Sequence, residues 1–267
     1  MSEPFRAQLR AMAMAFDVTL EGITSDAASV AMEAIHRELL RADDLFSLFR
    51  PDTPVARLAR GDATLAEMPA EVLEVLRLAE HYRQDTGGAF DIRRPDGVLD
   101  PSGIVKTWAV TKATTHLGDV PSWLISASGD VVAHGAPRRV GIADPAVKGD
   151  PAGSKVLDVA LIGGQWSAIA TSGSAQVADH IWDPVTGEPA RHFLQASVVG
   201  QDLVECDAWA TAICAGGGPV VERAVAAGLE VLIVTSGHSG GGYEAAASAG
   251  WPRAPRAIGD DGAALAQ

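Results

Sequence analysis

The chain has 267 residues, 47% of them hydrophobic, which is enough for a sizeable core in one compact unit or two fused subdomains. Its formal net charge is −13, with 21 Lys and Arg against 34 Asp and Glu. The basic residues are scattered, so the composition argues against nucleic acid and anionic membranes as partners, and an anionic ligand would need a local cation, a Lys or backbone N–H groups.

The first half of the chain is expected to be mainly helical. A strand comes first, Asp26 is suited to cap the helix that follows, and Pro69 and Gly87 are suited to open and close the next one. A loop with two Pro and three acidic residues then leads into a third helix. The expected strand is at residues 14–20, and the expected helices are at residues 27–44, 70–87 and 104–118.

The second half consists mostly of short apolar runs separated by turn residues, a pattern that predicts antiparallel strands. Because helices gather first and a meander of strands follows, the expected class is α+β, with a helical N-terminal part packed on a largely antiparallel sheet. The expected strands are at residues 122–128, 130–135, 138–144, 155–163, 165–173, 193–200 and 229–236, and two further helices are expected at 207–217 and 220–228.

Several common signatures are missing from the sequence. There is no GxGxxG after a strand and no GxxxxGK[ST], and the SGHSGGG run at residues 236–242 has the wrong spacing for either. Cys206 and Cys214 lie about 12 Å apart on one predicted helix, too far for a disulfide, so we interpret them as small buried residues in a reducing compartment. With no apolar signal-peptide core and no run of roughly 18 apolar residues, a cytoplasmic protein without a membrane span is expected.

The segment GGAFDIRRPDGVLDPSGIVK offers a possible anion site. Asp91 and Asp100 lie in a loop that leads into a helix, Gly103 provides free backbone groups at the helix start, and Lys106 follows one turn later. Helix N–H groups together with a Lys suit a phosphate. The alternative is that the Asp residues are helix caps and that Lys106 is simply solvated.

The segment ATSGSAQVADHIWDPVTGEP contains a histidine in polar surroundings. His180 stands beside Asp179 and Asp183, and Thr171 and Ser172 add hydroxyls nearby in the sequence. A histidine can act as acid, base or ligand near neutral pH, although a lone histidine is usually structural or exposed.

Asp207 and Thr211 in ECDAWATAIC are four residues apart, so they share one helix face. A carboxylate and a hydroxyl are hard oxygen ligands that suit Mg²⁺ rather than Zn²⁺. The alternative is an N-terminal Asp cap and a Thr that faces a neighbouring helix. The SGD run at residues 128–130 has the ordinary composition of a hairpin turn, and we assign it no function by itself.

In this order the segments resemble the ApbE-type flavin transferases, the FAD:protein FMN transferase family. The resemblance runs from Met12 to Ser236 through MAMAFDV, FSLFRPDTPVARL, TGGAFDI, LDPSGIVKTWAV, SASGDVVAHG, VGIADP, TSGS with HIWDPVTGEP, and SVVG with DAWATAI. The stretch His-Ile-x-Asp-Pro-x-Thr-Gly is the most specific piece. The resemblance implies an ApbE-like fold of two intertwined subdomains in one domain, residues 12–248, with an N-terminal extension, 1–11, and a loose C-terminal tail, 249–267.

The resemblance also implies a role for individual residues. His180, Lys106 and Asp207 fall on catalytic positions of the family, and Gly103, through its carbonyl, Asp207 and Thr211 fall on its Mg²⁺ ligands. The positions that fall where the family contacts FAD are Met12, Phe49, Ala89, Phe90, Asp91, Asp100 and Lys106.

The activity implied is Mg²⁺-dependent transfer of the FMN moiety of FAD to a Ser or Thr hydroxyl of an acceptor protein, with release of AMP. One alternative is hydrolysis of FAD to FMN and AMP by the same site, and another is a flavin-binding module without catalysis. The sequence departs from the family pattern at Ala13 and Met14, at Phe49, and at Thr107 and Thr111, where the family has Gly and Asp. The last two departures motivate the binding-module alternative.

Overall fold

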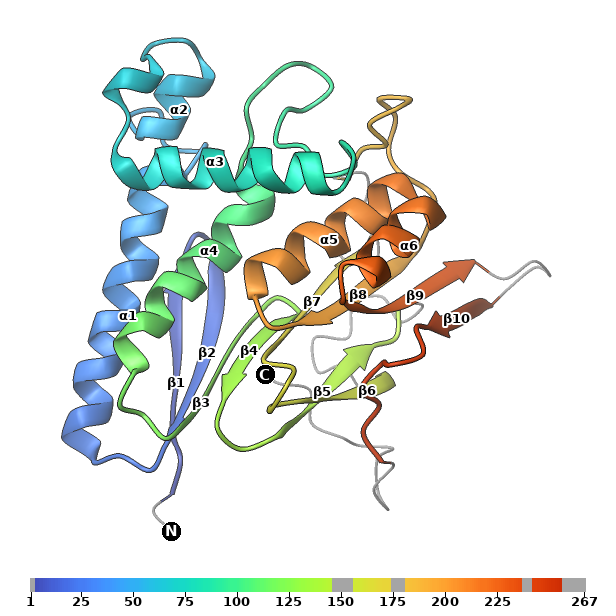
Figure 1. The fold of residues 1–267 in the computed structure, drawn as a ribbon. Coiled ribbons are helices and arrows are strands. Elements are labelled where there is room, and N and C mark those ends of the chain that lie inside the picture. Colours follow the sequence, from blue (N-terminus) through green and yellow to red (C-terminus); the bar gives the residue numbers. More distant parts are fainter. Residues whose placement is uncertain (1–2, 146–155, 174–180, 237–241, 256–267) are drawn as a thin grey trace.

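The computed structural model describes residues 3–145, 156–173, 181–236 and 242–255 (Figure 1). Its centre is an eight-stranded sheet in which every neighbouring pair is antiparallel, beside a separate two-stranded hairpin. In spatial order the sheet consists of β1 (Phe5–Ala11), β2 (Met14–Glu21), β3 (Ser122–Ala127), β4 (Asp130–His134), β7 (Ala168–Gly173), β8 (Gln195–Gly200), β9 (Glu230–Ser236) and β10 (Tyr243–Ala247), and the hairpin of β5 (Arg138–Ala143) and β6 (Val156–Ile162).

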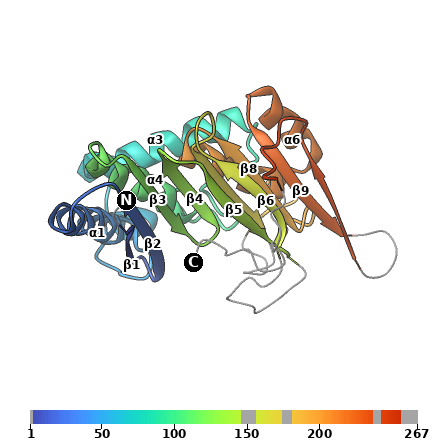
Figure 2. The same ribbon diagram turned by 90° about the horizontal axis from the view of Figure 1, so that it is seen from below.

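The helices gather on one face of the large sheet, as Figures 1 and 2 show from two directions. This arrangement confirms the expected α+β class with a largely antiparallel sheet. The helices are α1 (Ser25–Phe46), α2 (Pro54–Ala59), α3 (Ala70–Asp85), α4 (Ser102–Thr114), α5 (Leu203–Gly216) and α6 (Gly218–Ala226), with single 3₁₀ turns at Leu65–Glu67 and Thr115–Leu117. None of the helices in the described ranges is both long and apolar enough to cross a membrane.

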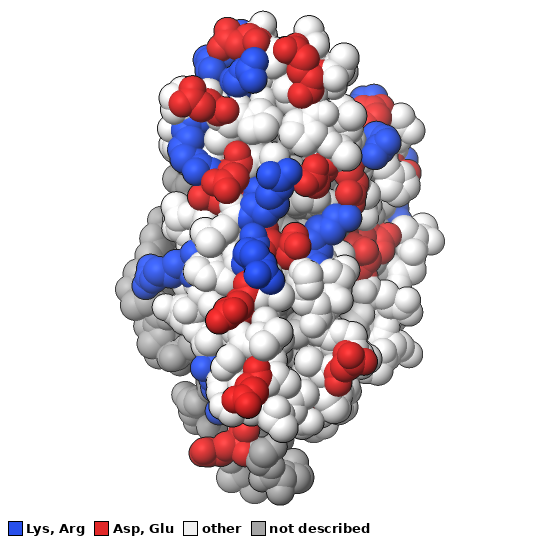
Figure 3. All heavy atoms as spheres, turned by 90° about the vertical axis from the view of Figure 1, so that its left-hand side faces the viewer, with Lys and Arg blue, Asp and Glu red and all other residues white. Residues whose placement is uncertain are grey.

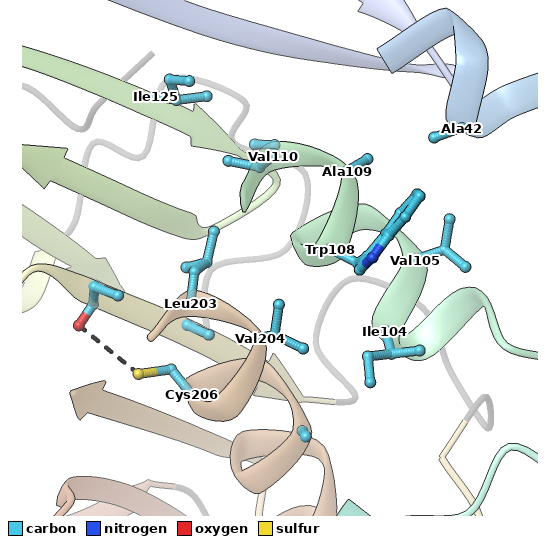
Figure 4. Packing of buried hydrophobic residues seen from close by; sticks show 14 of the residues in the cluster. Ala42, Ile104, Val105, Trp108, Ala109, Val110, Ile125, Leu203, Val204 and Cys206 are labelled. Atoms are coloured by element: carbon cyan, nitrogen blue, oxygen red, sulfur yellow. Dashed lines mark hydrogen bonds between the residues drawn. The ribbon is translucent and has the colours of Figure 1, made fainter. Parts of the chain in front are cut away.

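The two faces of the sheet bury two separate cores. In β7, Ala168 and Ala170 belong to the core under the helices, whereas Ile169 between them belongs to the core under the β5–β6 hairpin. This alternation follows from the period of two along a strand. Figure 4 shows the first core where α4 and α5 meet, with Trp108 and Val204 among its side chains.

Helices α4 and α5 are apolar around most of their circumference, as expected for helices packed on several sides. The two cysteines, Cys206 and Cys214, are free thiols buried in α5, which confirms their interpretation as small buried residues. On the face that Figure 3 shows, basic and acidic side chains are interspersed, with no broad basic area.

The structure differs from the predicted elements mainly at their ends and edges. Helix α1 begins at Ser25, because Thr24 rather than Asp26 is its cap and accepts a hydrogen bond from the Ala27 N–H at 3.3 Å. Strands β1 and β10 and helix α2 were not predicted. The C-terminal tail was expected to be loose from residue 249, but its first residues pack against the fold. Trp251 is buried in the second core, and Arg253 pairs with Asp158 at 2.7 Å.

An ion pair fastens the β5–β6 hairpin to the large sheet. The Arg138 guanidinium donates from Nη1 and Nη2 to Oε1 and Oε2 of Glu21, at 3.0 and 2.7 Å, and Nη2 also donates to Ser122 Oγ at 2.8 Å. The hydrogen bond from Arg138 holds the pKa of Glu21 below its ordinary value of 4.5. The ionised carboxylate is therefore the form that the fold stabilises.

We expect Glu21→Gln to lower the free energy of unfolding by about 1 kcal/mol at pH 7. A carboxyl with a lowered pKa stabilises the fold above its unfolded-state pKa, and this stabilisation is lost as pH falls through the folded-state pKa. Urea denaturation at pH 7 and pH 3 should therefore show a difference from wild type that shrinks at the lower pH. Glu33→Gln, at an exposed residue of α1, is the control and should have no effect at either pH; a Glu21 effect independent of pH would contradict the ionic explanation.

Candidate active site

Several turns and strand ends come together at one end of the large sheet. Residues Met12 and Ala13 form the β1–β2 turn, and Ser128 and Gly129 form the β3–β4 turn. Because neighbouring strands are antiparallel, the starts of β2 and β4 lie beside the ends of β3 and β7. Met12, Ala13 and Ser128 have φ of 49°, 58° and 49°, and they are the only non-glycine residues with positive φ in the described ranges. This costly backbone conformation is typical of functional sites, and it occurs here in two turns at the same end of the sheet.

A buried ion pair joins this end of the sheet to α4. Lys106 Nζ lies 2.6 Å from Asp130 Oδ2, and the Asp130 side chain, at the start of β4, is only 2% exposed. Its other oxygen, Oδ1, accepts a hydrogen bond from the Thr171 N–H at 3.1 Å. Burial raises the pKa of Asp130, and the Lys106 ammonium opposes that shift. The pair therefore holds the Lys106 ammonium at a fixed place beside the sheet.

A second buried carboxylate, Asp207 of α5, lies close to this pair. Asp207 is 5% exposed, and its Oδ2 accepts a hydrogen bond from Thr107 Oγ1 at 3.0 Å. Burial, together with the charge of Asp130, raises the pKa of Asp207 to about 7, although Lys106 and the Thr107 hydroxyl oppose the shift. Burial disfavours the charge on Lys106 as well, but Asp130 and Asp207 outweigh it and raise the Lys106 pKa. The Lys106 ammonium therefore interacts with both carboxylates, Asp130 and Asp207.

The structure contradicts the alternative in which Asp207 caps its helix and Thr211 faces a neighbouring helix. The cap of α5 is Asp202, whose side chain accepts the Glu205 N–H at 2.9 Å, so Asp207 lies in the second turn and caps nothing. The Thr211 hydroxyl is 3.0 Å from Ser172 Oγ of β7, so it faces a strand rather than a helix. Both side chains therefore point from α5 toward the sheet end where Lys106 and Asp130 meet.

Gly103 lies at the exposed start of α4, where a metal ligand was expected. Helices α4 and α5 pack together and run in opposite directions (Figure 1). Starting from the Thr107–Asp207 hydrogen bond, one turn back along α4 leads to Gly103, and one turn forward along α5 leads to Thr211. The three expected ligands, Gly103, Asp207 and Thr211, thus come from adjoining turns of two packed helices.

The donors at this place fit a magnesium ion better than a softer metal. In the described ranges no three His, Cys, Asp or Glu side chains gather as a metal site, so imidazole and thiolate clusters are not found there. The expected set is one carboxylate, one hydroxyl and one carbonyl, which resembles the Mg²⁺ sites that substrate phosphates complete. Two buried carboxylates beside a single ammonium also leave a negative balance that favours a cation.

The segment before α4 braces the start of that helix. Ala89 and Phe90 are buried, and the Phe90 N–H donates to Thr86 Oγ1 at 3.0 Å. A Cβ placed on Gly103 would be 3.8 Å from the Phe90 ring, and one on Gly216 would be 3.0 Å from Ala89 Cβ. Ala89 and Phe90 therefore lie between the start of α4 and the end of α5.

Asp91 and Asp100 have local structural roles. Asp91 Oδ1 accepts the Arg93 N–H at 2.8 Å, and Asp100 Oδ1 accepts the Ser102 N–H at 3.1 Å. Asp100 stands just before Pro101, the cap residue of α4, so its bond to Ser102 is a local turn contact and neither Asp91 nor Asp100 is the helix cap of the alternative interpretation.

Three expected site residues remain, and the two that the structure describes, Met12 and Phe49, are not part of the cluster of Lys106, Asp130 and Asp207. Met12 is half-buried in the strained β1–β2 turn at the same end of the sheet. Phe49 follows α1 and is 97% exposed. His180 lies outside the described residues.

Sequence reasoning missed two features of the site. The sequence around Asp130 has the composition of an ordinary hairpin turn, yet Asp130 is the buried partner of Lys106. No pattern in the sequence singles out His192, whose Nε2 lies 3.0 Å from Asp183 Oδ2. Its ring packs against Gly217, the residue that follows α5, since a Cβ on that glycine would be 3.0 Å from the ring. The available signal for Asp130 was an acidic residue at the start of a strand that is otherwise apolar.

Comparison with known proteins adds a family to this geometry. The sequence profile of the ApbE family matches residues 12–94 and 93–233. Comparison with curated protein sequences gives no match.

Several solved structures share the fold. The flavin transferase ApbE from Vibrio cholerae is 19% identical with a TM-score of 0.78, over 93% of this chain and 98% of that one. The ApbE protein from Thermotoga maritima is 23% identical with a TM-score of 0.76, over 91% and 96% of the two chains. The flavinyl transferase ApbE of Pseudomonas stutzeri, in its apo form, is 20% identical with a TM-score of 0.74, over 92% and 94%.

Proposed function

Because the chain belongs to the ApbE family, we propose that it is an FAD:protein FMN transferase that moves the FMN moiety of FAD onto a Ser or Thr hydroxyl of an acceptor flavoprotein. The observation that carries the proposal is the cluster of Lys106, Asp130 and Asp207, where the first turns of α4, the start of β4 and the second turn of α5 meet. Two carboxylates that share one largely buried ammonium are costly for the fold, and such clusters are typical of functional sites.

The donor FAD carries a pyrophosphate, which the start of α4 is suited to hold. The first N–H groups of a helix attract anions, and Lys106 adds a positive charge one turn farther along. Gly103, exposed and without a side chain, lets a phosphate approach the backbone closely. Ala89 and Phe90 keep this helix start in place against α5.

The divalent cation, Mg²⁺ by our proposal, would be held by the Gly103 carbonyl, the Asp207 carboxylate and the Thr211 hydroxyl. When bound it would neutralise phosphate charge and so favour attack on phosphorus. The Asp207 carboxylate is suited to this role because, among the described donors, only Thr107 hydrogen-bonds to it, through Oδ2.

In the proposed reaction the acceptor hydroxyl oxygen attacks the phosphorus on the FMN side of the pyrophosphate. A new P–O bond to the acceptor forms, the P–O bond to the AMP side breaks, and AMP leaves with the bridging oxygen. The hydroxyl proton passes to a base, for which the sequence resemblance offers His180. Lys106 stabilises the charge that builds up on the phosphate oxygens.

One assay tests the proposal against its alternatives. Purified protein is incubated with FAD, with Mg²⁺ or with EDTA, alone and with an acceptor domain that carries a target Thr; AMP and protein-bound flavin fluorescence are measured. Mg²⁺-dependent AMP release with covalent flavin on the acceptor is the expected result. AMP and free FMN without labelling would instead indicate an FAD pyrophosphatase, and FAD binding without AMP would indicate a binding module; either would overturn the proposal.

A further inference from the structure

Thr107 occupies an unusual place between the two helices of the site. It is fully buried, and its hydroxyl lies 3.0 Å from Asp207 Oδ2 and 3.2 Å from the carbonyl of Ile104 in its own helix. A hydroxyl has one proton, and a carboxylate is the stronger acceptor. The shorter of the two contacts, to Asp207, therefore takes the proton whenever the carboxylate is ionised.

This hydrogen bond fixes which oxygen of Asp207 is available. Oδ2 is engaged by Thr107, whereas no donor in the described ranges reaches Oδ1. Lys106 does not take that place, since its Nζ is held 2.6 Å from Asp130. Among the described residues, Asp207 is thus held through Oδ2, and its Oδ1 has no hydrogen-bond donor.

We propose that Thr107 is a positioning residue for the divalent cation: it holds Asp207 through Oδ2 so that Oδ1 faces the ion. The inference rests on the proposed function, because it takes Asp207 as a metal ligand. Ligating carboxylates are commonly held by such a partner, and its loss typically weakens metal binding about 10- to 100-fold.

A purely structural role for Thr107 makes a different prediction. Threonine in a helix often bonds the carbonyl three or four residues earlier, and the Ile104 carbonyl lies within reach of the Thr107 hydroxyl at 3.2 Å. If that bond were its purpose, removal of the hydroxyl would change stability and leave metal affinity alone. Metal affinity and stability must therefore be measured on the same variants.

The test compares Thr107→Val, which keeps the shape and removes the hydroxyl, with Thr107→Ser, which keeps the hydroxyl. Binding of Mn²⁺ alone to the full-length protein is followed by electron paramagnetic resonance, and Mg²⁺ competition gives its affinity. We expect the Val variant to bind roughly 10- to 100-fold more weakly and the Ser variant to bind nearly as well as wild type. Thr111→Val, the same change one turn farther along α4, is the matched control and should bind like wild type.

Other variants separate failure of this inference from failure of the proposed function. If wild type and Asp207→Asn bind Mn²⁺ equally, the metal site itself is wrong, and the role of Thr107 is wrong with it. If Asp207→Asn loses binding but Thr107→Val keeps it, only the positioning role is overturned. Thr107→Ala removes the same hydroxyl without adding a methyl group, and it replaces the Val variant if thermal unfolding shows that Val disturbs the fold.

Discussion

Asp207→Asn is expected to lower the rate of AMP release from FAD by about 100- to 1,000-fold at a fixed Mg²⁺ concentration. Loss of the only carboxylate among the proposed ligands removes several kcal/mol of charge stabilisation, and each 1.36 kcal/mol corresponds to a factor of about ten in rate. Asparagine has nearly the same volume, and its oxygen can still accept the Thr107 hydrogen bond. The measurement is AMP production against Mg²⁺ concentration.

The free energy of unfolding of the metal-free protein should not fall with the rate. Burial and the nearby Asp130 charge raise the pKa of Asp207 to about 7, so the fold disfavours the charge that asparagine removes. We therefore expect urea denaturation to give an equal or higher stability for the variant. A residue that costs stability but is needed for turnover is typical of a functional site.

The matched control is Asp202→Asn in the same helix. Asp202 caps α5, and asparagine caps about as well, so neither rate nor stability should change. If Asp207→Asn kept the Mg²⁺ dependence of wild type, Asp207 would not be a metal ligand. Loss of both rate and stability would place Asp207 in the structure of α5 rather than in the reaction.

The sequence predicted the helices and strands that carry long periodic patterns, and it failed where tertiary contacts decide. Residues 243–247 form β10 only because β9 is available as a partner. Helix α2 depends on the cap at Thr53, whose hydroxyl accepts the Ala56 N–H at 3.2 Å. Capping and edge pairing involve few residues, so they leave little trace in a periodic pattern.

The residues of the candidate site divide in the same way, between those marked by a local pattern and those that depend on tertiary contacts. Lys106, Asp207 and Thr211 lie in local patterns, a helix start and a pair four residues apart, that have chemical meaning without the fold. Asp130 has no such pattern, because its partner Lys106 is on another element and the turn before it has ordinary composition. That Thr107 bonds to Asp207, one hundred residues away, also depends on how α4 and α5 pack.

Asp130 is the subject of the second large expected effect. Asp130→Ala should lower the free energy of unfolding by about 3 kcal/mol, because it removes the buried carboxylate with which the largely buried Lys106 ammonium pairs. It also removes the acceptor of the Thr171 N–H. Asp130→Asn, which can keep that hydrogen bond, should cost less. Thermal and urea unfolding of the two variants measure these costs.

The Asn variant should also change the metal requirement. Lys106 interacts with both Asp130 and Asp207, so when Asp130 loses its charge the ammonium turns toward Asp207 and competes with the cation. We expect the Mg²⁺ concentration for half-maximal AMP release to rise about tenfold, equal to about 1.4 kcal/mol, with a smaller change in rate at saturating Mg²⁺.

The control for Asp130 is another Lys–carboxylate pair of the same helix. Lys112 Nζ lies 2.7 Å from Glu74 Oε1, but both side chains are more than a third exposed. Glu74→Gln should therefore change stability by no more than about 1 kcal/mol and leave the Mg²⁺ requirement unchanged. Equal effects of the two substitutions on the Mg²⁺ requirement would show that any loss of negative charge near α4 has this effect, and that the contact between Asp130 and Lys106 is not its cause. A shift confined to Asp130→Asn would support the contact between Asp130 and Lys106 as its cause, since Asp130 is buried and Lys106 also interacts with Asp207.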